Sequence, residues 1–158
     1  PLKATPNRGP EMKKGEMLAS MLIIAPSAHN GQFDRGGAPY ILHCLKVMHY
    51  TKSEDEEILC IALGHDLFED TKVTHVDLRE AGVSDRVISG ILAMTKMPGE
   101  TYDEYKAKVK GNKDSTLVKM ADLRHNSDIR RLKGVADKDI DRIAKYMKFF
   151  TELKESLT

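Results

Sequence analysis

The stretch Gly64-His65-Asp66-Leu67-Phe68-Glu69-Asp70 is the most informative part of the chain, because an apolar run ends there in side chains suited to metal binding and acid-base chemistry. The run Ile58 to Leu63 predicts a helix that is buried on all sides. On one continuous helix, His65 and Glu69 share a face, as do Asp66 and Asp70. Buried charges need a metal ion or a partner. The stretch therefore predicts a hydrolytic metal site, unless it is only a solvated acidic helix end.

Two other segments offer partners for this stretch. Residues 39–48 have apolar side chains at positions 41, 42, 45 and 48, which predicts a helix with His43 near its start. Residues 117–126 predict another helix, on which Asp122 and Asn126 lie four apart on one face. Each residue alone has an ordinary structural explanation, as a surface histidine or as a side chain bonded to nearby backbone. Their combination favours a site.

The order of these residues resembles the HD superfamily of metal-dependent phosphohydrolases. The flanking residues narrow the resemblance to the hydrolase domain of RelA/SpoT-type enzymes, whose pattern reads roughly AHxGQxRxxGxPYIxHP. Residues 28–43 of this chain read AHNGQFDRGGAPYILH, and the resemblance continues through GHDLFEDT at 64–71 and VKMADLRHN at 118–126. The three blocks fall in family order within residues 17–132.

The resemblance implies an activity that removes pyrophosphate from the 3′ position of ppGpp and pppGpp with one bound manganese ion. Residue by residue, it assigns the metal ligands to His43, His65, Asp66 and Asp122. It assigns Glu69 and Asp70 to the handling of the attacking water, and Asn126 to substrate contact. This chemistry suits the residue types, because a divalent ion activates water and a neighbouring carboxylate accepts its proton. The ligand set alone also accommodates zinc, iron or nickel.

The sequence departs from the family pattern at three places. Asp34 stands where many members have an arginine, and Arg35 follows one place later. Cys44 stands where a proline usually follows the ligand histidine, and Leu123 and Arg124 are in the reverse of the common order. None of these changes removes an expected ligand.

A phosphate-rich substrate needs cationic contacts. Arg35 and Lys96 are the stronger candidates, while Lys119 and Arg124 also lie in the matched blocks. Tyr102 and Tyr105 lie between the second and third blocks and are predicted either to form a pocket wall or to face the core.

The whole chain is predicted to be all-α, a single compact multi-helix HD-superfamily domain over 1–158, with 1–10 as a loose terminus. Ser84 is a predicted N-cap for the next apolar helical period. A long final helix is predicted to pack through a stripe that consists of Ile140, Ile143, Met147, Phe150, Leu153 and Leu157. No alternating strand pattern competes with these helices.

Composition excludes several partners. The 25 basic and 24 acidic residues give a formal charge of +1, so no general attraction to nucleic acid is expected. The cluster Arg130-Arg131-Leu132-Lys133 is interpreted as a solvated helix end. The apolar run from Met17 to Pro26 is too short to span a membrane, and a cytoplasmic protein with reduced Cys44 and Cys60 is expected. A homodimer is permitted but not required.

Three functions remain open from the sequence. The first is hydrolysis of a 3′-pyrophosphorylated nucleotide, with the adenosine form (p)ppApp and a nicotinamide dinucleotide phosphate as further substrates. The second is another HD-type nucleotide phosphohydrolase, such as a nucleotidase or an NADPH phosphatase. The third is a non-catalytic alarmone-binding module. The chain's length resembles that of the stand-alone small alarmone hydrolases, so synthesis is not expected.

Overall fold

A computed structural model describes residues 12–158, and the predicted loose terminus, 1–10, lies outside the described residues. The described part contains nine α-helices and one 3₁₀ helix, and its one β-type contact is an isolated antiparallel bridge between Phe33 and Pro39. The predicted all-α class is confirmed. The helices are α1 (Glu16–Ala28), α2 (Ile41–Tyr50), α3 (Glu56–Gly64), α4 (Leu67–Asp70), α5 (His75–Glu80), α6 (Asp85–Met94), α7 (Tyr102–Lys110), α8 (Lys113–Asn126), η1 (Ile129–Arg131) and α9 (Asp137–Ser156).

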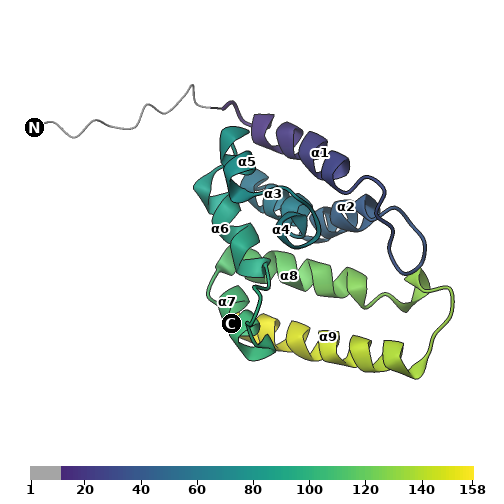
Figure 1. Ribbon diagram of the computed structural model, residues 1–158. Helices are drawn as coiled ribbons and strands as arrows, with labels where there is room; N and C mark the ends of the chain where they lie inside the picture. The colour runs from purple at the N-terminus through teal and green to yellow at the C-terminus, as the bar shows by residue number, and fades with distance from the viewer. Residues whose placement is uncertain (1–11) are drawn as a thin grey trace, which may run out of the picture.

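Helix α3 forms the centre of the fold, with α1 above it and α8 and α9 below it in Figure 1. It contacts α1, α2, α6 and α8. All its residues from Cys60 to Gly64 are buried, as the apolar run predicted. Asp55 begins the helix by accepting a hydrogen bond from the backbone N–H of Glu57 at 3.0 Å.

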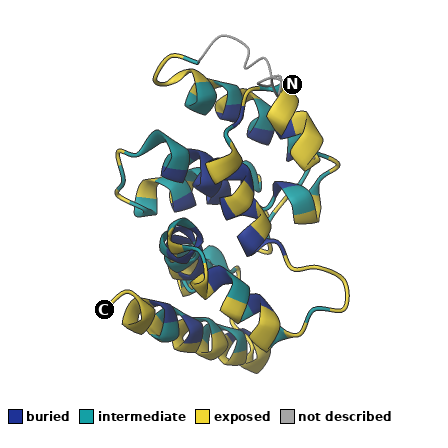
Figure 2. Cartoon of the chain, turned by 90° about the vertical axis from the view of Figure 1, so that its left-hand side faces the viewer, coloured by how far each residue is buried: buried dark blue, intermediate teal, exposed yellow. Residues whose placement is uncertain are grey.

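A second, smaller core lies between α7, α8 and α9 and contains Tyr105, Leu123, Phe149 and Leu153. Figure 2 shows buried residues concentrated in the inner helices, while most of the outer surface of α9 is exposed. Side chains of Asp, Asn, Ser or Thr cap the N-terminal ends of several helices. Ser84 caps α6, as predicted, because its hydroxyl accepts a hydrogen bond from the backbone N–H of Val87. None of the described helices is both long and apolar enough to cross a membrane.

Two sequence predictions need correction. The predicted single helix across 58–70 is interrupted, because α3 ends at Gly64 and the short helix α4 begins at Leu67. His65 and Asp66 occupy this break, where the ring Nδ1 of His65 bonds the carbonyl of Ala62 at 2.7 Å. The two side chains can therefore approach the same point, which a continuous helix would not allow.

The predicted packing stripe of α9 is also partly wrong. Leu153 is buried, but Ile140 and Met147 are 49% and 41% exposed. The buried face is centred instead on Phe149, with Tyr146 packed against the same small core. The predicted stripe included Phe150, which also packs against this core, but it overlooked Phe149 and Tyr146.

Candidate metal centre

Three separate parts of the chain bring the predicted metal ligands together. His43 comes from the first turn of α2, His65 and Asp66 from the break before α4, and Asp122 from the last turns of α8. Ligand atoms of His43, His65 and Asp66 all lie within 4.8 Å of one another.

Asp122 completes the cluster. Its Oδ1 lies 2.9 Å from Nε2 of His43 and 3.3 Å from Nε2 of His65. Both histidines and Asp122 are at least 97% buried, so the cluster lies within the protein and not on its surface.

Hydrogen bonds orient both imidazole rings toward this point. Nδ1 of His65 donates to the carbonyl of Ala62, which leaves its Nε2 facing the carboxylates. Nδ1 of His43 lies 2.7 Å from Nδ1 of His125. Burial, together with the charges of Arg131 and His43, lowers the pKa of His125 to about 4, so His125 is neutral at pH 7 and its Nδ1 can accept a hydrogen bond from Nδ1 of His43. Both Nε2 atoms are then available as ligands.

The carboxylates carry negative charge deep in the protein. Burial alone would raise the pKa of Asp122, but Lys119, His43 and His65 outweigh it and hold this pKa well below its usual range. Lys119 Nζ lies 2.8 Å from Oδ2 of Asp122, and Asn126 Nδ2 donates to Oδ1 at 2.9 Å. Tyr40 similarly donates its hydroxyl to Oδ2 of Asp66. Each ligand carboxylate therefore has an outer partner.

The donor set fits a divalent cation. Nε2 of His65 is buried and makes no hydrogen bond, although Asp66 Oδ2 lies 2.9 Å away. An unpaired buried polar atom is costly, and a cation between the two imidazoles and the two carboxylates would satisfy it. Burial lowers the pKa of His65, but the charges of Asp66 and Asp122 outweigh this effect and raise the pKa well above its usual value. A proton therefore competes with any cation for this nitrogen.

Glu69 and Asp70 lie in α4, immediately after the ligand pair, and both residues are exposed. A Glu69 carboxylate oxygen accepts the backbone N–H of Lys96. Desolvation raises the pKa of both carboxyl groups, and Asp66 raises both further. Both carboxylates therefore bind a proton more readily than a free side chain does, which suits a group that accepts one.

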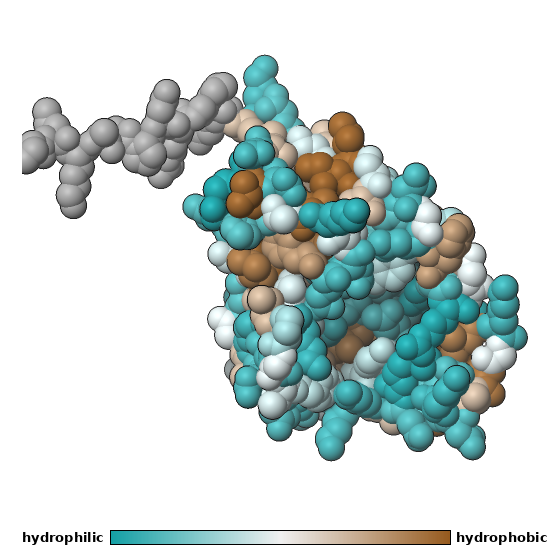
Figure 3. Space-filling model, in the orientation of Figure 1, coloured by the Kyte–Doolittle hydropathy of each residue, from teal (hydrophilic) through white to brown (hydrophobic). Residues whose placement is uncertain are grey.

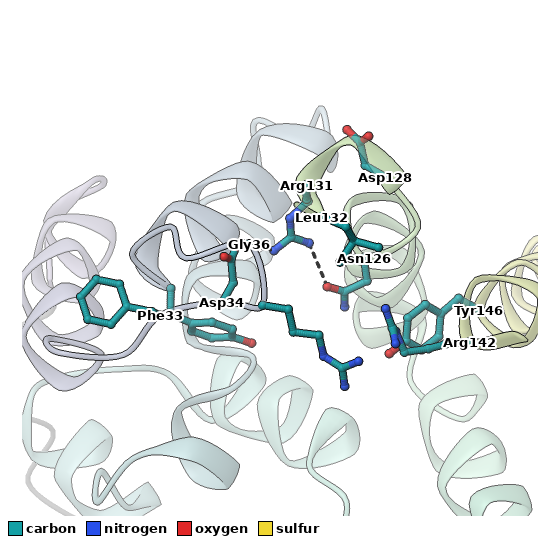
Figure 4. A pocket seen from close by; sticks show the side chains of 11 residues that line it. Phe33, Asp34, Gly36, Asn126, Asp128, Arg131, Leu132, Arg142 and Tyr146 are labelled. Carbon is teal, nitrogen blue, oxygen red and sulfur yellow. Dashed lines mark hydrogen bonds and ion pairs between the residues drawn. The ribbon is translucent and has the colours of Figure 1, made fainter. Parts of the chain in front are cut away.

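A cavity of about 230 Å³ lies beside the cluster and contains both Arg35 and Asn126. Figure 4 shows that its other side chains come from the Gly31–Tyr40 loop, from η1 and from α9. Three arginines line it, together with the aromatic rings of Phe33, Tyr40 and Tyr146. The space-filling view in Figure 3 shows a hollow on the face seen in Figure 1, bordered mainly by hydrophilic side chains. The cavity combines positive charge with apolar surface, as a nucleotide site requires.

The other predicted contacts lie elsewhere. Tyr102 borders a separate hollow formed by α7 and α9, and Tyr105 is 7% exposed and donates its hydroxyl to the carbonyl of Met94. Tyr105 thus takes the core-facing alternative. The Lys119 ammonium is bound to Asp122, and the Arg124 guanidinium stacks on the ring of Tyr50 at 4.1 Å. Lys96 contacts the site through its backbone N–H, which donates to the Glu69 carboxylate.

Sequence reasoning missed five residues of the site. Tyr40 and His125 stood inside the matched blocks but received no role, and Arg131 stood in a cluster interpreted as a solvated helix end. Arg131 instead lines the cavity and pairs with Asp34. Arg142 and Tyr146 come from α9, whose orientation the sequence did not reveal. A search for polar residues beside Phe149 on the buried face of α9 would have found both.

Fold and site together define an all-helical domain with an HD-type hydrolase fold and a buried cluster that could hold a metal ion. No family model matches the sequence. The chain is nevertheless homologous to the SpoT-type ppGpp hydrolases. It is 33% identical over 138 residues to a guanosine-3′,5′-bis(diphosphate) 3′-pyrophosphohydrolase of Haemophilus influenzae, covering 78% of this chain and 20% of that protein. It is 30% identical over 121 residues to the bifunctional (p)ppGpp synthase/hydrolase SpoT of Escherichia coli, covering 69% of this chain and 17% of SpoT.

The chain therefore spans about a fifth of the length of these relatives. A solved structure of similar length matches more fully. It is described as a metazoan ortholog of SpoT that hydrolyzes ppGpp and plays a role in starvation responses. The TM-score is 0.71 at 21% identity, and the match covers 90% of this chain and 86% of the other. This likeness establishes the shared fold.

Proposed function

We propose that this protein removes the 3′-pyrophosphate from ppGpp-type nucleotides, with one Mn²⁺ ion held by His43, His65, Asp66 and Asp122. The observation that carries the proposal is the convergence of these four side chains next to a cavity lined by three arginines. The homology to SpoT-type proteins supports the same reaction.

When bound, the ion would act as a Lewis acid that polarises a phosphate oxygen and lowers the pKa of water. Contacts around the ligand residues hold these side chains in place. Lys119 and Asn126 hold Asp122, Tyr40 holds Asp66, and the Nδ1 partners of the two histidines fix their rings. These outer contacts orient the ligand side chains toward the metal position.

Glu69 takes the proton from the attacking water as general base. Its position three residues beyond Asp66 brings it to the edge of the cluster, and its raised pKa strengthens it as a base. The backbone N–H of Lys96 orients the Glu69 carboxylate. Asp70 follows it in α4, where its carboxylate would stabilise the partial positive charge on the attacking water before the proton is removed. The water oxygen bonds to the phosphorus attached to the ribose 3′ oxygen as the bond between that phosphorus and the 3′ oxygen breaks. The 3′ oxygen then takes up the proton held by Glu69, and pyrophosphate is released.

The cavity binds the rest of the substrate. Arg35 and Arg142 line it and provide charge for the phosphate groups, while the ring of Tyr146 offers a surface for a base. Asn126 lies at its inner end, beside Asp122. Nothing in this arrangement selects guanine, so ppApp is a second substrate within the proposal.

The test is to incubate metal-stripped protein with ppGpp, ppApp and NADPH in turn, with and without Mn²⁺, and to identify the products by anion-exchange chromatography. The proposal expects Mn²⁺-dependent release of pyrophosphate from ppGpp. Release of phosphate alone would favour another HD-type phosphohydrolase, such as an NADPH phosphatase. Tight binding of ppGpp without turnover would favour a non-catalytic module.

The variant Glu69→Gln separates the base from the metal site. Removal of a general base should lower kcat by about 10²-fold or more and leave Mn²⁺ affinity within a few fold. Glu155→Gln, which alters an exposed carboxylate near the end of α9, is the matched control. Unchanged turnover in Glu69→Gln would show that this role is wrongly assigned.

A further inference from the structure

The Gly31–Tyr40 loop is fastened to η1 by one ion pair, although the two segments are far apart in sequence. Oδ2 of Asp34 lies 3.1 Å from Nη2 of Arg131, and the two side chains are only 13% and 20% exposed. The backbones also meet closely, because a side-chain carbon at Gly36 would lie 2.0 Å from the carbonyl oxygen of Arg131. Only glycine allows this approach.

The Arg131 guanidinium also reaches the metal cluster through Asn126. Nη1 of Arg131 donates to Oδ1 of Asn126 and to the carbonyl of His125, both at 3.1 Å, and Figure 4 shows the contact with Asn126. Nδ2 of Asn126 donates to Oδ1 of Asp122 at 2.9 Å. A guanidinium only donates and a carboxylate only accepts, so the two contacts fix the orientation of the amide.

These contacts occupy Arg131 with protein acceptors. The guanidinium has about five N–H donors. It uses them in contacts with Asp34, Asn126 and the His125 carbonyl. Asp34 is itself tied down, since its Oδ1 accepts the backbone N–H of Ala38 at 2.9 Å. Asp34 also stands where the resembling RelA/SpoT pattern has an arginine. The negative charge of Asp34 attracts a neighbouring guanidinium and repels a phosphate.

We propose that Arg131, held by Asp34, is a positioning residue that orients the Asn126 amide toward Asp122 and so fixes this ligand for metal binding and turnover. The proposal rests on the proposed function for its effect on turnover. Without Arg131, the Asn126 amide is free to turn, and its oxygen would then face the carboxylate and repel it. Asp122 would lose one of its outer partners while keeping Lys119.

The first test compares Arg131→Met with Arg130→Met in three measurements. These are the unfolding midpoint without metal, the affinity for Mn²⁺ by titration, and kcat and KM for ppGpp. Arg130 is the matched control, because its side chain is 84% exposed and pairs with Asp128. Arg131→Met should weaken Mn²⁺ binding by about 10-fold and lower kcat by about 10-fold, as loss of an outer partner does. Values within twofold of wild type for both would overturn the proposal.

The double variant Asp34→Arg/Arg131→Asp separates positioning from simple fastening. The exchanged charges can form the ion pair again, so the unfolding midpoint should recover relative to either single variant. A carboxylate at position 131 cannot donate to Asn126, so Mn²⁺ affinity and kcat should stay low. Recovery of all three together would mean that the pair only fastens the loop, and would overturn the proposal.

Two further variants cover the remaining outcomes. In an Asn126→Ala background, Arg131→Met should have little further effect on Mn²⁺ affinity, because the amide through which it acts is gone. If Arg131→Met fails to fold, Arg131→Lys keeps the charge near Asp34 but cannot reproduce the fork of donors, and should also lower kcat. Should the wild type hydrolyse none of the nucleotides, the proposed function fails, while Mn²⁺ affinity still decides the positioning role.

Discussion

Removal of the charge on Asp122 should destabilise the protein even when no metal is present. Asp122 is the buried partner of Lys119, with 2.8 Å between Nζ and Oδ2 and side-chain exposures of 16% and 5%. The variant Asp122→Asn keeps the size of the side chain but leaves the Lys119 ammonium without its counter-charge.

The expected magnitude follows from this geometry. Two unit charges at 2.8 Å attract by about 6 kcal/mol at an effective dielectric constant near 20. The neutral amide still accepts a hydrogen bond, and loss of the carboxylate relieves repulsion with Asp66, so the net effect is smaller. Breaking a buried pair by removal of one partner costs about 3–5 kcal/mol. We expect a loss of about 3 kcal/mol in the free energy of unfolding, or about 6–12 °C in Tm for a chain of this size.

The assay is urea unfolding in EDTA, applied to wild type, Asp122→Asn, Lys119→Met and the double variant. The double variant should recover stability relative to Asp122→Asn, since it contains no unpaired buried charge. Asp85→Asn is the control, because Asp85 pairs with Arg79 at 3.4 Å on an open surface and its loss should cost below about 1 kcal/mol. A loss of stability in Asp122→Asn no larger than in this control would refute the reasoning.

Three further predictions follow from the same contacts. At saturating Mn²⁺, kcat/KM should fall as pH drops through a pKa above 4.5, because Glu69 must be unprotonated to act as base and its pKa is raised. A pH profile of kcat/KM should show this decrease at low pH in wild type and not in Glu69→Gln. Gly90→Ala should destabilise the fold by about 1–3 kcal/mol, since the added carbon would lie 2.4 Å from Cδ1 of Ile61, whereas Gly134→Ala, which meets no atom within 4 Å, should not; thermal unfolding compares the two. Tyr40→Phe should weaken Mn²⁺ binding by about 10-fold in a calorimetric titration, because Asp66 loses its hydroxyl donor, and unchanged affinity would exclude this support role.

The sequence predicted the parts of the fold that depend on local pattern. The apolar run before His65 specified a helix that is buried from Cys60 to Gly64, and Ser84 specified a helix start. The convergence of His43, His65, Asp66 and Asp122 was predicted through the family resemblance, because three spaced blocks identified the site where single residues could not.

The parts that failed depend on long-range packing. The break at His65 and Asp66 carries only a weak local signal, which consists of Gly64 at the end of α3 and Asp66 as the N-cap of α4. The orientation of α9 depended on Phe149 packing with Tyr102 and Tyr105, which lie more than forty residues earlier. For the same reason Arg131 resembled a surface residue until its partner Asp34, 97 positions away in the chain, was known.

The proposed activity depends on one divalent ion held by His43, His65, Asp66 and Asp122. Equilibrium dialysis of the wild type and of His65→Ala against Mn²⁺, followed by elemental analysis, tests it most directly. We predict one Mn²⁺ per wild-type chain and a loss of at least tenfold in affinity in the variant, while Arg130→Met keeps full binding. Absence of bound metal from the wild type, or an unchanged affinity in His65→Ala, would contradict the account.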